Sequence, residues 1–233
     1  MARQDVARQD VARQDVARQD VARQDVAPTS GLPAPRREPH PGRGRPLSDD
    51  TERAILQATS ELLAERGLAS MTIEEVAARA HVGKASIYRR WPTKGTLALD
   101  AFVTDYLAHQ QVPDTGSLRD DLLGLLRAWV RAVRQSTVGR TLKGLIAEVQ
   151  RDPELADAWR DRFVVPLRTR HLAVLQRSIE RGELVPHANT GLLLDLVFGP
   201  AYHRLLHGHM PLNDAFVEDV VAAVMAAVEA GTI

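Results

Sequence analysis

The stretch Met71–Leu97, MTIEEVAARAHVGKASIYRRWPTKGTL, predicts two short helices joined by a tight turn. Thr72, with Glu75 three residues later, forms a capping-box pattern that begins the first helix. The second helix is expected over about Lys84–Trp91, because Pro92 cannot continue it. Two short helices around a tight turn are typical of a helix-turn-helix.

Basic side chains gather at the end of this motif. Residues 79–94 contain five lysines and arginines and no acidic residue. Lys84 and Tyr88 lie four residues apart and share a helix face, with Arg89 beside them. An arginine or lysine can reach guanine in the major groove, while Ser86 and Tyr88 suit phosphate contacts. This pattern predicts binding to double-stranded DNA.

The order V-G-K-A-S-I-Y-R-R-W-P-T-K, following the capped T-I-E-E-V-A-A-R-A helix, resembles the DNA-binding domain of TetR-family transcriptional regulators. The resemblance covers roughly residues 46–101, and the chain departs from the family's usual residues at Arg90 and Gly95. Ala85 would face the bases, where its methyl group can contact a thymine methyl. The resemblance implies that the family's contact positions fall on Thr72, Lys84, Tyr88 and Lys94.

The amino-acid composition excludes several kinds of functional site. The chain has 233 residues, no cysteine and a formal net charge of zero. The lack of cysteine excludes disulfides, thiolate zinc sites and a cysteine nucleophile. Because the sequence contains neither an 18-residue apolar run nor a signal-peptide core, we expect a cytoplasmic protein without a membrane partner.

The first 46 residues are expected to form a disordered repeat followed by a Pro/Gly/Arg-rich arm. Residues 2–26 are five copies of Ala-Arg-Gln-Asp-Val, whose valines spiral around a helix and can bury no core. We therefore expect the repeat to have no role in folding, with a tether as the alternative. Arg43 and Arg45 precede the first predicted helix and can enter a narrow minor groove, unless they are incidental to a flexible linker.

Helical periodicity and the absence of strand-like alternation predict an all-α fold. We expect a helix-turn-helix DNA-binding domain of three helices over residues 47–101 and a helical bundle for ligand binding and dimerisation over 102–233. Pro166 lies inside a helical stretch of residues 153–181 and predicts a kink or break near residues 162–166. The expected helices cover about 48–67, 72–80, 84–91, 94–109, 117–135, 138–151, 153–181 and 190–207, with a last one after Asn213.

Aromatic residues concentrate on the middle helices. The resemblance implies that these helices enclose a pocket for a small-molecule effector, although aromatic spacing also fits an ordinary core. The candidate pocket residues are Phe102, Tyr106, Trp129, Trp159 and Phe163.

Each of the last two predicted helices carries an apolar face that is broader than one neighbouring helix can cover. These faces fit either an intrachain core or a two-fold four-helix interface between two copies. We favour the homodimer, because a single helix-turn-helix unit rarely gives adequate operator affinity. The candidate interface residues are Leu193, Val197, Leu205, Phe216, Val220, Val221 and Val224.

These features favour a homodimeric, ligand-responsive regulator that represses from a palindromic operator, with no enzymatic activity, cofactor or metal. One alternative is a ligand-independent DNA-binding or architectural protein. Another is a helical metal-dependent enzyme that uses His203, His207 and His209, whose spacing suits a metal but lacks a matching carboxylate.

Overall fold

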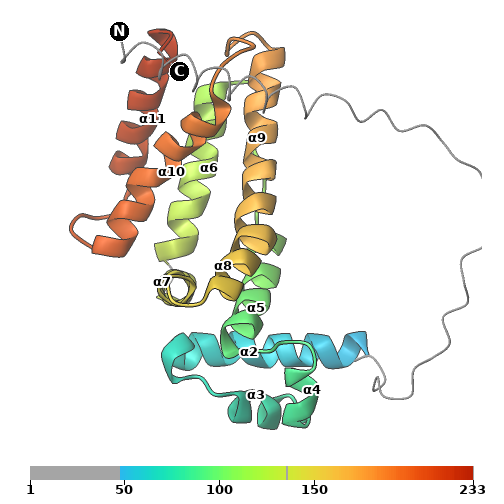
Figure 1. The fold of residues 1–233 in the computed structure, drawn as a ribbon. Helices are drawn as coiled ribbons and strands as arrows, with labels where there is room; N and C mark the ends of the chain where they lie inside the picture. The colour runs from blue at the N-terminus through green and yellow to red at the C-terminus, as the bar shows by residue number, and fades with distance from the viewer. Residues whose placement is uncertain (1–47, 135, 233) are drawn as a thin grey trace, which may run out of the picture. The chain divides into compact units, whose positions relative to one another are not determined.

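The computed structural model describes residues 48–134 and 136–232, and the secondary structure of this part of the chain is helical without strands (Figure 1). The predicted all-α fold is therefore confirmed. The repeat and arm of residues 1–46, with Arg43 and Arg45, lie outside the described residues. The elements are α2 (Asp49–Ser70), α3 (Ile73–Arg79), α4 (Lys84–Tyr88), α5 (Lys94–Ala108), α6 (Leu118–Arg134), α7 (Ser136–Val149), α8 (Pro153–Trp159), the π-helix η1 (Arg160–Val164), α9 (Val165–Glu180), α10 (Thr190–His207) and α11 (Asp214–Glu229).

Side chains cap the helices where the sequence predicts it. The Thr72 hydroxyl accepts the Glu75 N–H at 3.3 Å, while the Glu75 carboxylate accepts the Thr72 N–H at 3.1 Å. Asn213 begins α11 by accepting the Phe216 N–H at 3.0 Å. These contacts satisfy amide groups that a helix start leaves unpaired.

Gly67, where the sequence predicts the end of the first long helix, lies at a kink that joins two helical segments within α2. Gly67 has φ +76° and interrupts α2, but helical residues continue to Ser70. Only glycine adopts this backbone angle at little cost, so the residue produces a kink within the element.

The second helix of the helix-turn-helix is shorter than predicted, because α4 ends at Tyr88 rather than at Trp91. The chain then turns, and Trp91 becomes buried with 1% of its surface exposed. Its indole N–H donates to Asp100 at 2.8 Å, which fixes the turn against α5.

The predicted disruption near Pro166 is confirmed and takes the form of the π-helix η1, which separates α8 from α9. A proline in a helix lacks an N–H and collides with the carbonyl four residues earlier, here that of Arg162. The wider π turn accommodates this by inserting an extra residue. Phe163 of this turn is directed into the core and is 1% exposed.

A continuous core joins the helix-turn-helix to the later helices. α2 packs against α3, α5 and α7, and α6 packs against α7, α9, α10 and α11. In Figure 1, α5 leads away from α3 and α4 towards α8 and α9. No helix in the described part of the chain is long and apolar enough to cross a membrane.

Gly139 lies near the start of α7, at the tight corner between α6 and α7. A Cβ atom at this position would collide with the backbone carbonyl oxygen of Val133. Replacing a mid-helix glycine by alanine usually stabilises a protein by about 1 kcal/mol. At this corner we expect the opposite effect. Gly139→Ala should lower the free energy of unfolding by about 1–3 kcal/mol through overpacking.

Urea denaturation followed by circular dichroism measures this effect. Gly144→Ala on the same helix is the matched control, because its Cβ would meet the Leu68 side chain at an ordinary 3.4 Å. Equal stability of the two variants would show that the corner tolerates a side chain.

Candidate nucleic-acid interface and ligand cavities

The helix-turn-helix exposes one side of α4 and anchors the other. Ile87 is completely buried, whereas the neighbouring Tyr88 is 49% exposed. The side chains predicted to contact DNA are therefore free to meet a partner from solution. The exposed or half-buried positions among them are Thr72, Lys84, Ala85, Ser86, Tyr88, Arg89 and Lys94.

The positive charge of residues 79–94 is partly neutralised by acidic residues that precede it in the chain. The ion pairs join Arg79 to Glu65 at 2.6 Å, Lys84 to Glu74 at 2.9 Å and Arg90 to Glu52 at 2.7 Å. Counting charges along a short stretch missed these pairs, because their acidic partners lie on α2 and α3. The hydrogen bond that the Lys84 amine donates to the Glu74 carboxylate raises the pKa of this amine, so the amine must exchange one anion for another to bind phosphate.

Two predicted contact residues keep their cationic groups outside ion pairs. Arg89 forms no ion pair with any residue that the structure describes, and Lys94 donates only to the carbonyl oxygen of Ala69 at 3.3 Å. A DNA phosphate can therefore bind these cationic groups, and no ion pair has to be broken first. Arg89 and Lys94 are thus the least compensated cations of the motif.

Asp100 connects the end of the helix-turn-helix to the π-helix. One carboxylate oxygen accepts the Trp91 indole N–H at 2.8 Å, and the other accepts the Arg162 guanidinium at 2.8 Å. Trp91 follows α4, whereas Arg162 belongs to η1. The carboxylate therefore links the turn after α4 to η1, whose Arg162 follows Asp100 by 62 residues in the sequence.

Gly95 allows α8 to approach the start of α5. A Cβ on Gly95 would lie 2.8 Å from Cδ2 of Leu155, which is completely buried. The glycine at which the chain departs from the family's usual residue thus makes room for a side chain of α8. The sequence offers no local sign of this contact or of the one between Asp100 and Arg162.

Four of the five candidate pocket residues form one aromatic cluster. Phe102, Tyr106 and Phe163 have ring centroids 5.4–5.6 Å apart, and Trp159 contacts Phe163 at 4.5 Å. Trp129 instead packs against Tyr202 at 5.0 Å. The predicted pocket residues therefore do not surround a single space.

Two cavities border this cluster. The junction cavity, of about 630 Å³, is lined by Phe102 and Tyr106 and lies between α2, α5, α6 and α7. The second cavity, of about 340 Å³, is lined by Trp129 and Phe163 and lies between α6, η1, α9 and α10. Trp159 lines neither of them. Both volumes fall in the range of small-molecule sites.

His171 lies in the wall of the second cavity, stacked on Phe198 with ring centroids 4.8 Å apart. Burial, followed by the charges of Arg168 and Arg170, lowers the pKa of His171 to about 4. An unfolded chain takes up this proton near pH 6.5, but the folded protein does so only near pH 4. Stability therefore falls as the pH drops from 6.5 to 4, by about 3 kcal/mol at most.

The variant His171→Phe retains the ring stack and removes the titration. We expect wild type to lose more stability than this variant between pH 6.5 and 4, as measured by urea denaturation at each pH. The carboxylates titrate in both proteins, so their effect cancels in the difference. If the two proteins lost equal stability over this pH range, the folded protein would accept the proton as readily as the unfolded chain.

The structure divides the candidate interface residues of α10 and α11 into two groups. Leu193, Val197 and Val221 are completely buried within the protomer, and Phe216 and Val224 are each 4% exposed. Leu205 and Val220 are half-buried. The apolar side chains of α10 that remain exposed are Leu192, Leu196 and Leu206.

An apolar groove of about 630 Å³ runs between α10 and α11 and includes Leu196, Val220 and Ala223. His203 and His209 lie at the same groove, with ring centroids 4.9 Å apart, and His207 lies 4.6 Å from His203. Within residues 48–134 and 136–232, no group of three or more His, Asp or Glu side chains is arranged to hold a metal ion. The geometry therefore gives the metal-enzyme alternative no support.

Two family models together match most of this chain. The model of bacterial regulatory proteins of the tetR family matches residues 55–101. The model of a tetracyclin repressor-like C-terminal domain matches residues 112–224.

Individual proteins show the same similarity. The chain is 36% identical over 188 residues to YdeS, an HTH-type transcriptional regulator of Bacillus subtilis (strain 168), covering 81% of this chain and 94% of YdeS. It is 33% identical over 175 residues to the DNA-binding transcriptional repressor TetR of Mycobacteroides abscessus, covering 74% of this chain and 90% of that protein. The crystal structure of the TetR family transcription regulator SCO0332 aligns with a TM-score of 0.70 at 36% identity, covering 77% of this chain and 99% of that one.

Proposed function

Because the chain belongs to the TetR family of transcriptional regulators, we propose that it is a ligand-responsive repressor that binds a pseudo-palindromic operator as a homodimer. Members of this family bind DNA and small-molecule ligands, usually act as dimers and are not enzymes. We further propose that residues 47–101 form the DNA-binding part, that residues 102–233 bind ligand and dimerise, and that the protein acts in the cytoplasm.

The exposed side of α4 is the observation that carries the DNA-binding proposal. With Ile87 buried as an anchor, Tyr88 and Arg89 extend into solvent beside Lys84 and Lys94. In a dimer, two such helices would enter successive major grooves, which requires half-sites about one helical turn apart. Arg43 and Arg45 remain predicted minor-groove contacts.

The two cavities support a response to an effector. Each cavity is lined by residues of helices that also contact α5. The first residues of α5 come directly after α4 and the turn that follows it. A ligand that prefers a DNA-incompetent arrangement would lower operator affinity, and DNA would weaken ligand binding by the same factor. Typical allosteric coupling of about 1–3 kcal/mol corresponds to roughly 5–150-fold release. A ligand-independent regulator would have no use for these cavities.

Binding to the DNA that flanks the protein's own gene tests the proposal. A labelled intergenic fragment is titrated in a gel shift, while sedimentation measures the stoichiometry. We expect one dimer per site, with competition by the specific fragment but not by unrelated DNA of equal length. Binding that is equally strong to both DNAs would contradict a sequence-specific operator.

A further inference from the structure

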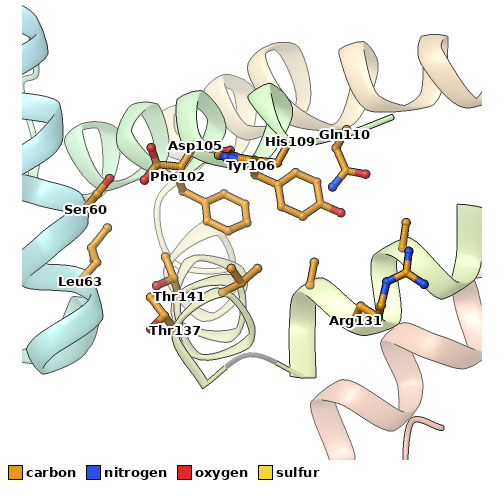
Figure 2. Close-up of a pocket in the computed structure, with 13 residues that line it drawn as sticks. Ser60, Leu63, Phe102, Asp105, Tyr106, His109, Gln110, Arg131, Thr137 and Thr141 are labelled. Carbon is orange, nitrogen blue, oxygen red and sulfur yellow. Dashed lines mark hydrogen bonds between the residues drawn. The ribbon is translucent and has the colours of Figure 1, made fainter. Parts of the chain in front are cut away.

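The junction cavity brings residues of the helix-turn-helix together with residues of the regulatory helices (Figure 2). Ser60 and Leu63 reach it from α2, Tyr106 from α5 and Thr141 from α7. Figure 2 shows the Tyr106 ring extending into the space, with Arg131 of α6 on the far side. A ligand in this cavity would touch both parts of the protein at once.

Two hydroxyl groups in the cavity wall have no hydrogen-bond partner. The Tyr106 side chain is 6% exposed and Thr141 is 3% exposed, and neither hydroxyl oxygen is bonded in the structure. Buried hydroxyls are normally paired, because leaving one unpaired forfeits its hydrogen bonds to water. Both are therefore positioned to meet polar atoms of a molecule inside the cavity.

Other threonines of this chain show that the Thr141 hydroxyl is exceptional. The hydroxyls of Thr59, Thr104 and Thr169 each donate to the carbonyl four residues earlier, at 2.7, 2.8 and 2.9 Å respectively. This local bond is the usual one for a threonine inside a helix. The Thr141 hydroxyl forms no such bond, and the Thr141 side chain lines the cavity.

The walls around these hydroxyls favour a flat aromatic body. Phe102 and Tyr106 are stacked one turn apart on α5, with ring centroids 5.4 Å apart and planes inclined by 16°. Apolar side chains complete the wall, among them Leu63, Ala128 and Val138. Aromatic rings pack well in offset or edge arrangements against such a surface.

The charges of the cavity lie at its exposed rim and balance one another. Arg131 and Asp105 line the cavity and are both exposed, and neither forms an ion pair within the described part of the chain. The buried residues Leu63, Phe102, Tyr106 and Thr141 carry no ionised group, since burial raises the pKa of Tyr106 and keeps its phenol protonated. A charged group placed deep in the cavity would lose its hydration without gaining a counter-ion.

We propose that the junction cavity binds an uncharged, flat aromatic molecule of two or three rings that carries a phenolic hydroxyl and a carbonyl oxygen. The oxygens pair with Tyr106 and Thr141, while the rings pack on Phe102. A long aliphatic chain would leave both hydroxyls unpaired, and a deeply placed carboxylate would remain uncompensated. This assignment deepens the proposed effector response by naming the class of ligand, and it rests on that function only for its regulatory consequence.

The test is a fluorescence titration of the full chain with 7-hydroxycoumarin, at a pH where the probe is uncharged and without DNA. Coumarin, which lacks the hydroxyl, is the matched probe and is measured by competition. Tyr106→Phe and Thr141→Val each remove one hydroxyl at nearly constant shape. We expect either variant to bind 7-hydroxycoumarin about 3–10-fold more weakly, the range of one hydrogen bond. Coumarin keeps the carbonyl oxygen, so its affinity should fall in the variant that removes the partner of the carbonyl and stay unchanged in the other.

The thermal stability of the ligand-free protein provides a second readout. Because each substitution removes an unpaired buried hydroxyl, both variants should melt about 2–4 °C higher than wild type. If the hydroxyls instead stabilised the fold, removing either of them would lower the melting temperature. Tyr202→Phe, which alters the second cavity, should leave probe binding unchanged.

Three results would overturn the assignment. They are the absence of probe binding at millimolar concentration, equal losses for both probes in both variants, and a loss confined to Tyr202→Phe. Because no DNA is present, failure here leaves the operator proposal intact. Conversely, a protein that binds no operator can still bind the probe.

Discussion

Combined replacement of Tyr88 and Lys94 by alanine is expected to abolish specific operator binding. Tyr88 is 49% exposed and Lys94 forms no ion pair with any described residue, so neither side chain is needed to stabilise the fold. A dimer of the double variant would lose four phosphate contacts. At about 1–1.5 kcal/mol for each contact, affinity falls by about 4–6 kcal/mol, or roughly 10³–10⁴-fold.

Gel shift or fluorescence anisotropy measures the loss, and circular dichroism verifies that helicity is retained. Arg160→Ala is the control, because it removes the same charge from an exposed ion pair outside the helix-turn-helix. For wild type, neutralisation of roughly 6–10 phosphates implies that affinity drops about 10³–10⁵-fold between 50 and 200 mM salt, and the double variant should show a shallower slope. Wild-type affinity in the double variant would refute this docking.

Leu196→Glu is expected to convert the proposed dimer into a folded monomer that binds operator poorly. Leu196 is 39% exposed in the protomer and lies at the apolar groove between α10 and α11. In a monomer the new carboxylate remains in water, whereas a two-fold interface would bury two unpaired charges. An uncompensated buried charge costs about 3–5 kcal/mol, so dimer dissociation should rise by at least about 10²-fold.

Sedimentation velocity at micromolar concentration distinguishes the two states. Val165→Glu provides a matched control, because Val165 is 50% exposed and lies on α9 rather than at this groove. Val221→Glu would be a poor test, since Val221 is completely buried and the substitution would disturb the core itself. A dimeric Leu196→Glu protein would place the interface on another surface.

The sequence predicts what depends on neighbouring residues. The capping contacts of Thr72 and Asn213, and the disruption near Pro166, involve backbone groups within four residues of the side chain. Such local hydrogen bonds and steric conflicts are encoded by spacing alone. They are sufficient to place the starts of α3 and α11 and the interruption between α8 and α9.

Interactions between distant elements could not be predicted in this way. Periodicity identified an apolar stripe on α10, but only the packing shows that Leu193 is buried inside the protomer while Leu196 is exposed. The basic stretch gave no sign that Glu74 pairs with Lys84, since the two lie on different helices. Likewise, five aromatic residues suggested one pocket, whereas the tertiary fold divides four of them between two cavities and leaves Trp159 outside both.

The Asp100 carboxylate makes the indole proton of Trp91 a spectroscopic reporter. The indole nitrogen lies 2.8 Å from the carboxylate oxygen and the Trp91 side chain is 1% exposed, so the indole proton should exchange slowly with deuterium. The chain has three tryptophans, and their indole resonances appear in an uncrowded region of the proton spectrum. Since the same carboxylate holds Arg162, a movement of η1 would change the shift and exchange rate of the Trp91 signal. Communication between the two parts of the protein can thus be followed in solution without attaching a label.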